Sequence, residues 1–423
     1  MRRPRSSSRK SGEAMDAHPP APGEDAADDS GDAAPREARR PITVLQVLPR
    51  LDLGGVERGA VEIARAVVAS GGRALIASEG GRLEARAAAA GAELVEGPFG
   101  SKNPFRILAN ARTLARICRE QAVDVIHARS RAPAWSALIA ARRTGTAFVT
   151  TWHGAYRETG RLKRLYNSVM AKGRPVIAIS EYTAAMARER YGLPDDAVEL
   201  IPRGADMNHF AEELIGTERA VALARAWGIV EDPRPVILLP GRLSRWKGQE
   251  HFVEAAAALK ARRGCDFLCL VVGDDGGRWG ERLIEKARGL DALDVVRVAG
   301  VCEDMPAAYK LSAAVVSASI DPEPFGRVAV EAQAMGRPVI ATDHGGARET
   351  VEHGVTGWLY TPGDAAALAD AMDRALSMDA SERAHMGMRG RARIANRFTV
   401  AEMQRRTLRV YERIVGRSFG ASL

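Results

Sequence analysis

Short apolar runs alternate with longer amphipathic stretches along most of this chain. Runs such as "ITVLQVLP", "RALIAS", "VDVIHA" and "TAFVTTW" are continuous and brief, which predicts buried strands. The stretches between them, such as "VERGAVEIARAVVASG" and "PFRILANARTLARICREQ", carry apolar residues at helical spacing. Buried strands that alternate with helices are typical of a parallel sheet covered on both faces. The pattern therefore predicts an α/β protein.

The alternation passes through two cycles. The second cycle begins at "RPVILLPG" and continues through "DFLCLVVG", "DVVRVAG", "AAVVSAS", "RPVIAT" and "GWLYTP". A chain of 423 residues also exceeds the size at which one core usually keeps growing. We therefore expect two doubly wound, Rossmann-like domains that face each other across a cleft, at residues 41–210 and 211–395. We expect residues 396–423 to form a helix that packs back on the first domain.

The first forty residues differ from the rest in composition. Residues 1–40 are rich in Ser, Pro, Gly, Ala and charge, and they cannot bury enough apolar surface to offset the entropy of ordering. We expect this tail to be disordered. It lacks the apolar block of a secretory signal, and no stretch approaches the roughly 18 uncharged apolar residues of a membrane-spanning helix. These observations predict a cytoplasmic protein.

Composition excludes several other classes. Apolar residues make up 46% and charged residues 27% of the chain, a globular balance that argues against a fibrous or mostly disordered protein. The four cysteines are too few and too scattered for a disulfide framework, and no CxxC pair or Cys/His cluster has metal-ligand spacing: Cys118, Cys265, Cys269 and Cys302. We expect inert thiols and no metal site.

The net charge of +8 is unevenly distributed. Residues 99–175 hold fifteen Lys and Arg residues against three acids, Glu120, Asp124 and Glu158. Such a surplus suits an anionic partner. Nucleic-acid motifs and interleaved stacking aromatics are missing, so an anionic membrane surface or an acidic acceptor is the preferred interpretation. A solvated basic surface that binds nothing is the alternative.

Ligands of open parallel sheets bind beyond the carboxyl ends of the strands, so residues there are the functional candidates. Gly54 and Gly55 follow the first strand and precede a helix, where backbone can approach a ligand and the helix start can face an anion. A glycine pair in a turn is as often structural. No GxG occurs, which argues against a nicotinamide-dependent oxidoreductase. His153 follows "AFVTTW", where an imidazole can bind a ligand hydroxyl or transfer a proton, or be a plain loop residue.

Two cations follow the first strand of the second cycle. Arg242 and Lys247 lie in "RLSRWKG", directly after "VILLPG", and fixed cations at a strand exit suit a diphosphate. No Asp-x-Asp pair is present to hold a divalent metal against that diphosphate. Cationic side chains and helix ends would then have to neutralise it. An exposed basic loop is the alternative interpretation.

Two glutamates, Glu323 and Glu331, lie eight positions apart in "DPEPFGRVAVEAQAMG". Pro324 is predicted to open a helix, which makes Glu323 the cap-like residue at the exit of a strand. In a structural interpretation, a carboxylate is favoured at the helix start, and Arg327 and Glu331 form an i,i+4 pair on the surface.

In a functional interpretation of the same segment, Glu323 accepts hydrogen bonds from sugar hydroxyls and Glu331 accepts them from a ribose. The backbone amides near Phe325 and Gly326 then meet a phosphate. The spacing alone does not choose between the two interpretations.

Taken together, these stretches resemble the retaining, nucleotide-sugar-dependent glycosyltransferases with the GT-B fold, grouped as family 4 or glycosyl transferases group 1. The resemblance covers residues 42 to about 415, and the matching motifs stand in family order: "LDLGGVERG", "TTWHG", "AISEYT", "IPRGADMNHF", "GRLSRWKGQEHFVEAAAAL" and "EPFGRVAVEAQAMGRPVIATDHGGARETVEHGVTGWLY". The last motif is highly specific.

The resemblance implies roles for the candidate residues. Glu323 and Glu331 become the two acids of the E-x7-E signature, with Glu323 near the transferred sugar and Glu331 near the ribose. Arg242 and Lys247 would contact the diphosphate, and His153 would meet the donor sugar.

The resemblance also places Gly54 and Gly55 in the loop that closes on donor and acceptor, with Phe325 and Gly326 beside the phosphate. Family members generally need no bound metal. In one departure, this chain has Pro202-Arg203-Gly204 where many members read "PNG".

The expected function is retaining transfer of a hexose-type sugar from a UDP- or GDP-sugar, with no bound cofactor. The expected acceptor is a cell-envelope glycan or glycolipid of the lipopolysaccharide or exopolysaccharide type. Contact with the anionic inner face of the cytoplasmic membrane is expected, and nucleic acid is not an expected partner. A GT-B nucleotide-sugar epimerase and a non-catalytic sugar-nucleotide-binding protein remain the alternatives.

Overall fold

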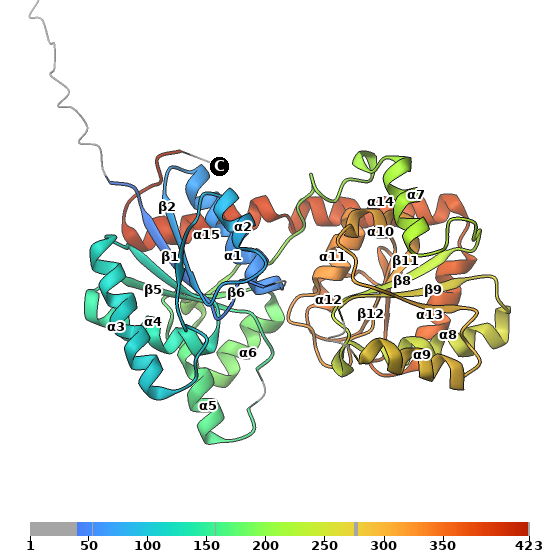
Figure 1. Cartoon of the computed structure of the whole chain (residues 1–423), viewed down its shortest axis with the longest axis horizontal. Coiled ribbons are helices and arrows are strands. Elements are labelled where there is room, and N and C mark those ends of the chain that lie inside the picture. The colour runs from blue at the N-terminus through green and yellow to red at the C-terminus, as the bar shows by residue number, and fades with distance from the viewer. Residues whose placement is uncertain (1–39, 53, 157, 275–277, 422–423) are drawn as a thin grey trace, which may run out of the picture. The chain divides into compact units, whose positions relative to one another are not determined.

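The structure is a computed structural model that describes residues 40–52, 54–156, 158–274 and 278–421. The tail predicted to be disordered lies outside these residues except for Arg40. The described residues form two parallel sheets with helices on both faces of each (Figure 1). The predictions of an α/β chain and of two doubly wound sheets are therefore confirmed.

The first sheet has seven strands in the order β3-β2-β1-β4-β5-β6-β7. All neighbouring pairs are parallel, and β1 lies between β2 and β4. The strand order therefore reverses direction between β1 and β4, which is where ligands of such sheets bind. The strands are β1 Thr43–Val47, β2 Arg73–Ser78, β3 Glu93–Glu96, β4 Val125–Ala128, β5 Ala147–Trp152, β6 Val176–Ala178 and β7 Val198–Leu200.

The second sheet has six parallel strands in the order β10-β9-β8-β11-β12-β13. Its order reverses between β8 and β11, so the loops after these two strands are the expected ligand positions. The strands are β8 Val236–Pro240, β9 Leu268–Val272, β10 Val296–Gly300, β11 Ser312–Ser317, β12 Val339–Thr342 and β13 Gly357–Tyr360.

Helices bury both faces of the first sheet. One face packs against α3 (Pro104–Glu120) and α4 (Arg131–Thr144), which lie side by side in Figure 1. The other face packs against α1 (Gly55–Ala69) and α2 (Glu84–Ala89), together with the last helix, α15 (Val400–Val415). The remaining helices of this lobe are α5 Arg161–Asn167, η1 Ser168–Lys172, α6 Glu181–Tyr191 and η2 Asp195–Ala197.

The second sheet is covered in the same way. One face packs against α8 (Gln249–Arg263), α9 (Trp279–Gly289) and α13 (Ala365–Ser377). The other face packs against helices that include α10 (Met305–Leu311) and α11 (Arg327–Ala334). The remaining elements of this lobe are η3 Glu212–Leu214, α7 Thr217–Ala226, η4 Arg245–Lys247, α12 Ala347–Thr350 and α14 Ala380–Arg397.

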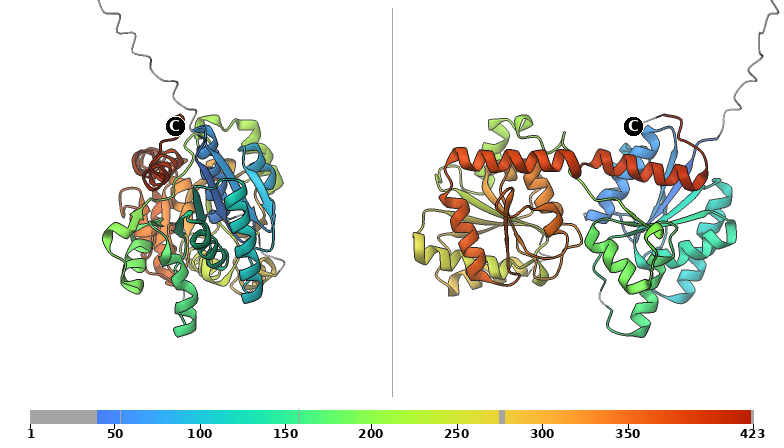
Figure 2. Two further views of the ribbon diagram at one scale, coloured as in Figure 1. Left: turned by 90° about the vertical axis from the view of Figure 1, so that its left-hand side faces the viewer. Right: turned by 180° about the vertical axis from the view of Figure 1, so that it is seen from behind.

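The chain ends as the sequence predicted, with a helix on the first lobe. Helices α14 and α15 follow one another (Figure 2); α14 packs on α11, whereas α15 packs on α1 and buries Met403, Leu408 and Tyr411 in the core of the first lobe. Only Phe398 and Thr399, which is the N-cap of α15, lie between the two helices.

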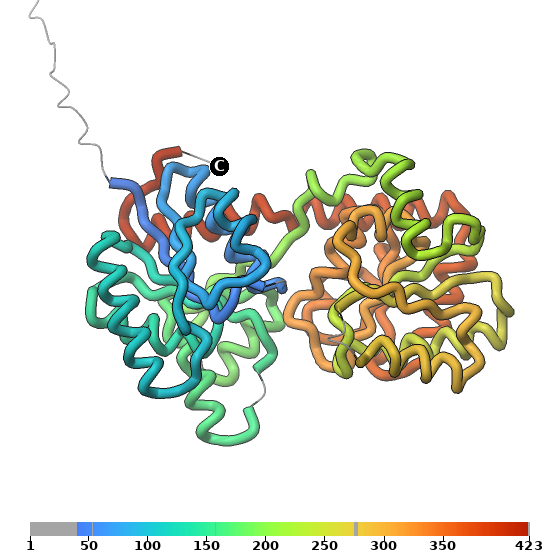
Figure 3. The backbone as a smooth tube through the Cα atoms, in the orientation of Figure 1, coloured from blue at the N-terminus to red at the C-terminus, as the bar shows by residue number. Residues whose placement is uncertain are grey.

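The two segments that connect the lobes contact each other. The amide of Ala205 donates to the carbonyl of Phe398 at 2.9 Å, and the amide of Val400 donates to the carbonyl of Ala205 at 2.9 Å. In the chain trace of Figure 3 these two segments are the green and the red stretches that run from one lobe to the other. Gly204 fits here because a Cβ atom would lie 2.2 Å from the carbonyl carbon of Thr399.

Two further findings concern the described residues as a set. Their four cysteines are unbridged, and Cys118 and Cys269 are buried. None of their helices combines the length and the apolar character that crossing a bilayer demands.

Candidate active site

The loops after β8 and β11 bring together an ammonium and a carboxylate. Lys247 ends the η4 turn after β8, and Glu323 lies in the loop after β11. The turn is tied to the β11 loop, because Ile320 donates its amide to the carbonyl of Trp246 at 2.8 Å. Gly248 has a φ of 72°, and a Cβ there would lie 1.9 Å from the carbonyl oxygen of Ala318. Glycine therefore permits the close approach that delivers Lys247 to Glu323.

The pair itself is tight and nearly buried. Lys247 Nζ lies 2.5 Å from Glu323 Oε1, and Ser319 donates its hydroxyl to the same oxygen. Burial by itself would raise the pKa of Glu323, but the charge and hydrogen bonds of Lys247, with the hydroxyl of Ser319, bring that pKa below its usual value. Glu323 is therefore an ionised acceptor at neutral pH.

A second loop fixes the backbone of Glu323. The amide of Gly346 donates to the carbonyl of Glu323 at 2.8 Å. A Cβ on Gly345 would lie 2.5 Å from that carbonyl oxygen, and a Cβ on Gly346 would lie 2.5 Å from the Cα of Phe325. The two glycines after β12 thus press against the loop that carries Glu323, a contact that our sequence reasoning missed although "HGG" offered the signal.

The predicted helix start at Pro324 is wrong. Helix α11 begins at Arg327, and its N-cap is Gly326 with a φ of 92°, so Glu323 lies in a loop and caps nothing. The close approach of the 345–346 loop and the left-handed glycine hold this segment out of the helix. Within the described residues, no hydrogen-bond acceptor meets the amides of Phe325 or Gly326, which leaves them available to an anion. The ring of Phe325 packs on Phe398 at 5.8 Å between centroids.

Glu331 is buried, with 5% of its surface exposed. Its Oε1 accepts from Arg327 Nε at 3.2 Å, and its Oε2 accepts from the Tyr309 hydroxyl at 3.2 Å. Arg58 of α1 adds a charge at 3.9 Å. The predicted i,i+4 pair with Arg327 exists, but it is an interior cluster and not a surface pair. Arg327 also donates to Glu62 of α1 at 3.3 Å.

Helix α1 begins at Gly55, with Gly54 as its N-cap. The carboxylate of Glu57 folds back onto this helix start, since its Oε2 would lie 2.2 Å from a Cβ on Gly54. Burial raises the pKa of Glu57, while backbone amides and the Arg242 charge oppose that rise. Arg242 is exposed, and its guanidinium makes no hydrogen bond or ion pair among the described residues, although its charge acts on Glu57. The sequence reasoning missed Glu57, which here holds the position expected for a ligand anion.

His153 follows β5, as predicted, and meets Arg203. Arg203 Nη2 lies 3.1 Å from His153 Nδ1. Burial, followed by the charges of Arg203 and Arg129, holds the pKa of His153 well below its ordinary value, so the imidazole is neutral. The structure therefore brings two of the predicted site residues, Lys247 and Glu323, into contact. Two others contact arginines that were not predicted as site residues: Glu331 contacts Arg327, and His153 contacts Arg203.

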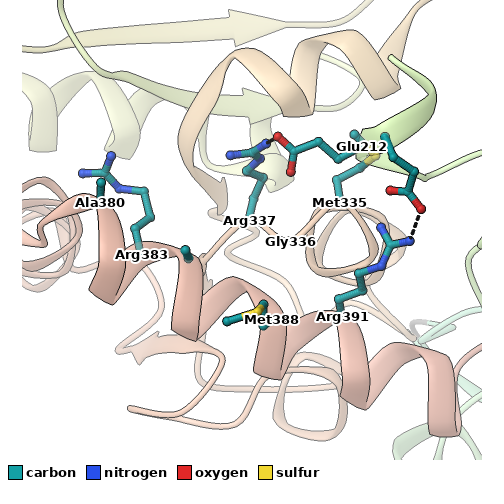
Figure 4. A pocket seen from close by; sticks show the side chains of 10 residues that line it. Glu212, Met335, Gly336, Arg337, Ala380, Arg383, Met388 and Arg391 are labelled. Carbon is teal, nitrogen blue, oxygen red and sulfur yellow. Dashed lines mark hydrogen bonds and ion pairs between the residues drawn. The ribbon is translucent and has the colours of Figure 1, made fainter. Parts of the chain in front are cut away.

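A cavity of about 540 Å³ in the second lobe contains none of the predicted site residues (Figure 4). It lies beside η3, α11 and α14. Arg337 pairs with Glu212 there, and Arg391 pairs with Glu213 at 2.9 Å. These pairs anchor η3 to the second lobe. In the described part of the chain, no group of three or more His, Cys, Asp or Glu residues is placed to hold a metal ion.

Comparison with known proteins identifies the family. The profile of "Glycosyl transferases group 1" matches residues 225–393, and that of "Glycosyltransferase Family 4" matches residues 53–209. The crystal structure of a glycosyltransferase from Rickettsia africae ESF-5 is 36% identical, covers 89% of this chain and 100% of its own, and superposes with a TM-score of 0.82.

Two further similarities are more limited. Anabaena HepE, crystallised with UDP and glucose, is 24% identical with a TM-score of 0.76 and covers 88% of this chain and 100% of its own, which is a likeness of fold. The D-inositol 3-phosphate glycosyltransferase of Nocardiopsis dassonvillei is 33% identical over 266 residues. That match covers 58% of this chain and 61% of the relative, so it spans about three fifths of the relative's length.

Proposed function

Because the chain belongs to the group 1, family 4 glycosyltransferases, we propose that it transfers a sugar from a nucleoside-diphosphate donor to an acceptor hydroxyl. The observation that carries this proposal is the Lys247–Glu323 pair at 2.5 Å, held at the exits of β8 and β11 where the strand order of the second sheet reverses. Beside it, the amides of Phe325 and Gly326 meet no acceptor among the residues that the structure describes.

In this proposal, the diphosphate of the donor binds the cations in the loop after β8. The guanidinium of Arg242 makes no hydrogen bond or ion pair with any described residue, and the Lys247 ammonium has three donors, of which the contact with Glu323 uses one. The amides of Phe325 and Gly326 supply further donors for a phosphate oxygen. Together these groups stabilise the negative charge that develops on the diphosphate as the sugar leaves.

The remaining roles follow from hydrogen-bonding capacity. Glu323 is ionised and accepts from hydroxyls of the transferred sugar, and Glu331 accepts from the ribose alongside Arg327 and Tyr309. Neutral His153 bonds a hydroxyl of the donor sugar. Gly54 and Gly55 admit the donor and acceptor close to the start of α1. Binding at that helix start requires the carboxylate of Glu57 to move aside.

We propose transfer with retained anomeric configuration and without a bound metal or other cofactor. The acceptor oxygen forms its bond to the anomeric carbon on the face from which the diphosphate departs. The bond from that carbon to the diphosphate oxygen breaks, and the diphosphate takes the acceptor's proton. No side chain is assigned as a nucleophile.

For substrates, we propose a hexose from a UDP- or GDP-sugar and, as acceptor, a cell-envelope glycan or glycolipid of the lipopolysaccharide or exopolysaccharide type. The surplus of cations in residues 99–175 favours an anionic acceptor. The Nocardiopsis relative is named for a phosphorylated inositol, so a soluble inositol phosphate is the competing acceptor class.

We further propose that the first lobe docks on an anionic membrane surface through α5 and the start of α3. Leu162 and Leu165 are 84% and 60% exposed on α5, and Phe105 on α3 is 83% exposed. Leu162 shares a surface groove with Lys102 and Lys163. Exposed apolar side chains among cations, with no acid on α5, suit insertion between anionic headgroups.

The central experiment measures release of nucleoside diphosphate from a panel of UDP-, GDP- and ADP-sugars. We expect the protein to turn over donors that carry one of the three nucleoside bases. Turnover is expected to increase when an acceptor is added. Lys247→Ala and Glu323→Ala are each expected to lower turnover at least about 100-fold. Lys260→Ala and Glu254→Ala are the matched controls, because these residues of α8 form ion pairs with Asp291 and Lys286, and their loss is expected to leave turnover unchanged.

The alternatives predict different results. Interconversion of UDP-sugar epimers with no acceptor present would favour the epimerase. Thermal stabilisation by nucleoside diphosphates with no turnover on any acceptor would favour a binding protein. Wild-type turnover in either site variant would refute the assigned site.

A further inference from the structure

A small pocket, called the chamber below, lies in the first lobe against α15. It measures about 10 Å³, which is room for one water-sized sphere. Four isoleucines and Met403 form half of its lining, and the polar residues that form the other half are His127, Arg129, Thr151, Arg203 and Thr407. None of these polar residues is among the predicted donor-site residues.

Two guanidinium groups are buried at this chamber. Arg129 is 1% exposed and Arg203 is 4% exposed. Burial, followed by the charge of Arg129, lowers the pKa of Arg203 to about 9, so it is still a cation at neutral pH. Gly59 makes room for it, because a Cβ there would lie 2.5 Å from Arg203 Nη1.

No carboxylate pairs with either cation among the described residues. Arg203 donates to the sulfur of Met403 at 3.0 Å and to His153, and Arg129 Nε donates to Gln46 Oε1 at 2.6 Å. Glu62 is the acid whose charge reaches both, but its hydrogen bond is with Arg327. Arg129 Nη2 is buried without a partner. Buried charge without a counter-charge is strongly unfavourable.

The hydrogen bonds around the chamber are arranged so that donors face it. The buried hydroxyl of Tyr411 lies 2.6 Å from His127 Nδ1, and the charge of Arg129 acts on it. Neutral His127 carries one ring proton, and in the tautomer with that proton on Nε2 it accepts from Tyr411 and donates to Thr151 Oγ1 at 2.7 Å. In this tautomer the hydroxyl proton of Thr151 is free, while that of Thr407 is donated to the Met403 carbonyl at 2.7 Å.

We infer that this chamber binds a single monatomic anion, of the halide class. A halide accepts hydrogen bonds in every direction and donates none, which matches a wall that offers Arg129 Nη2 and the Thr151 hydroxyl. Its charge offsets part of the Arg129 and Arg203 charge. Since Tyr411, Met403 and Thr407 belong to α15, the bound ion also holds that helix to the first lobe. The inference is independent of the proposed transfer reaction.

Thermal unfolding at fixed ionic strength tests it. Chloride and bromide are expected to raise the Tm of the full chain by about 3–8 °C over gluconate, which is too large to enter. Arg203→Met and Thr151→Val are expected to lose most of this difference. Arg262→Met is the matched control, because Arg262 pairs with Asp370 on the surface of the second lobe, and it should keep the difference.

Crystals grown in bromide give a second, variant-free measurement. An anomalous bromine peak between Arg129 and Thr151 is the expected result, and it decides the matter even if Arg203→Met does not fold. An ordered water alone in the chamber would overturn the inference. Equal Tm values in chloride and gluconate for the wild-type chain would overturn it as well.

Discussion

At the scale of single residues, the two segments that connect the lobes lie so close together that one position accepts only glycine. Gly204 lies where the first connection crosses the second, and a Cβ there would meet the Thr399 carbonyl carbon at 2.2 Å and the Val400 nitrogen at 2.6 Å. Both of those atoms are backbone, and the Ala205 hydrogen bonds hold them in place. A side chain at position 204 therefore cannot be accommodated by a rotamer change.

Gly204→Ala is accordingly expected to destabilise the chain by about 2–4 kcal/mol, because the two connecting segments must separate. Chemical denaturation monitored by far-UV circular dichroism measures the change. Gly289→Ala is the control: position 289 ends α9, has no atom within 4 Å of its Cβ position, and is expected to be neutral or slightly stabilising. Equal stability of Gly204→Ala and wild type would contradict the argument.

Residue-scale roles were the least predictable from the sequence. Glu323 and Lys247 could be singled out because each follows a predicted strand, but their 2.5 Å contact depends on Gly248 fitting against Ala318, seventy residues away. Arg203 carried no signal beyond its departure from a motif. Its partners, His153 and Met403, come from β5's exit and from α15, and no local pattern connects three such segments.

At the scale of elements, most strands were predictable because burial on both faces leaves continuous apolar runs. The start of α11 was not. Proline at position 324 satisfies the local rule for a first helical turn, yet the helix begins at Arg327 because the 345–346 loop presses on the preceding residues. That contact comes from β12's exit, so local sequence rules cannot see it.

The charge of helix α5 can be read from its sequence, whereas the exposure of its leucines comes from the structure. Its seven residues carry three cations and no acid, and its two leucines are exposed instead of buried. An amphipathic helix in a globular core would bury those leucines. Leu162 also shares a surface groove with Lys102 and Lys163, so this surface is the one on which we base the proposed membrane contact.

The double variant Leu162→Ser, Leu165→Ser is therefore expected to weaken binding to vesicles that contain anionic phospholipid by about tenfold or more, since partial burial of two leucines is lost. Co-sedimentation with such vesicles is the measurement. Leu214→Ser, at an exposed leucine in η3, is the control and should bind as wild type does. Binding should also weaken with salt.

Two results would count against this surface. The double variant could bind as tightly as wild type, which would place the contact elsewhere. Wild type could bind neutral and anionic vesicles equally, or neither, which would remove the charge argument.

At the scale of the whole molecule, the candidate residues concentrate where the strand order of each sheet reverses. Gly54 and Gly55 follow β1 of the first sheet, and Lys247 and Glu323 follow β8 and β11 of the second. The sequence could predict that each of these residues follows a strand, because strand exits are readable from apolar runs and ligands of parallel sheets bind beyond them. The order itself is a property of the sheets and was available only from the structure.

This arrangement gives the molecule a way to neutralise a diphosphate with its own groups. The guanidinium of Arg242 makes no hydrogen bond or ion pair among the described residues, Lys247 has donors to spare, and the amides of Phe325 and Gly326 meet no acceptor there. All of them belong to loops at one end of the second sheet. We propose that their combined positive potential stabilises the diphosphate without a metal ion.

Chelation tests this conclusion directly. Transfer by protein dialysed against EDTA is expected to stay within about twofold of the untreated rate, because protein cations and amides stabilise the leaving diphosphate. UDP or GDP in EDTA should still stabilise the chain against unfolding, by about 2.7 kcal/mol at a hundredfold excess over its Kd. Lys247→Ala should lose most of that stabilisation, whereas Lys260→Ala should keep it. A rate that falls more than about tenfold in EDTA and returns with Mg²⁺ or Mn²⁺ would show that these groups do not suffice.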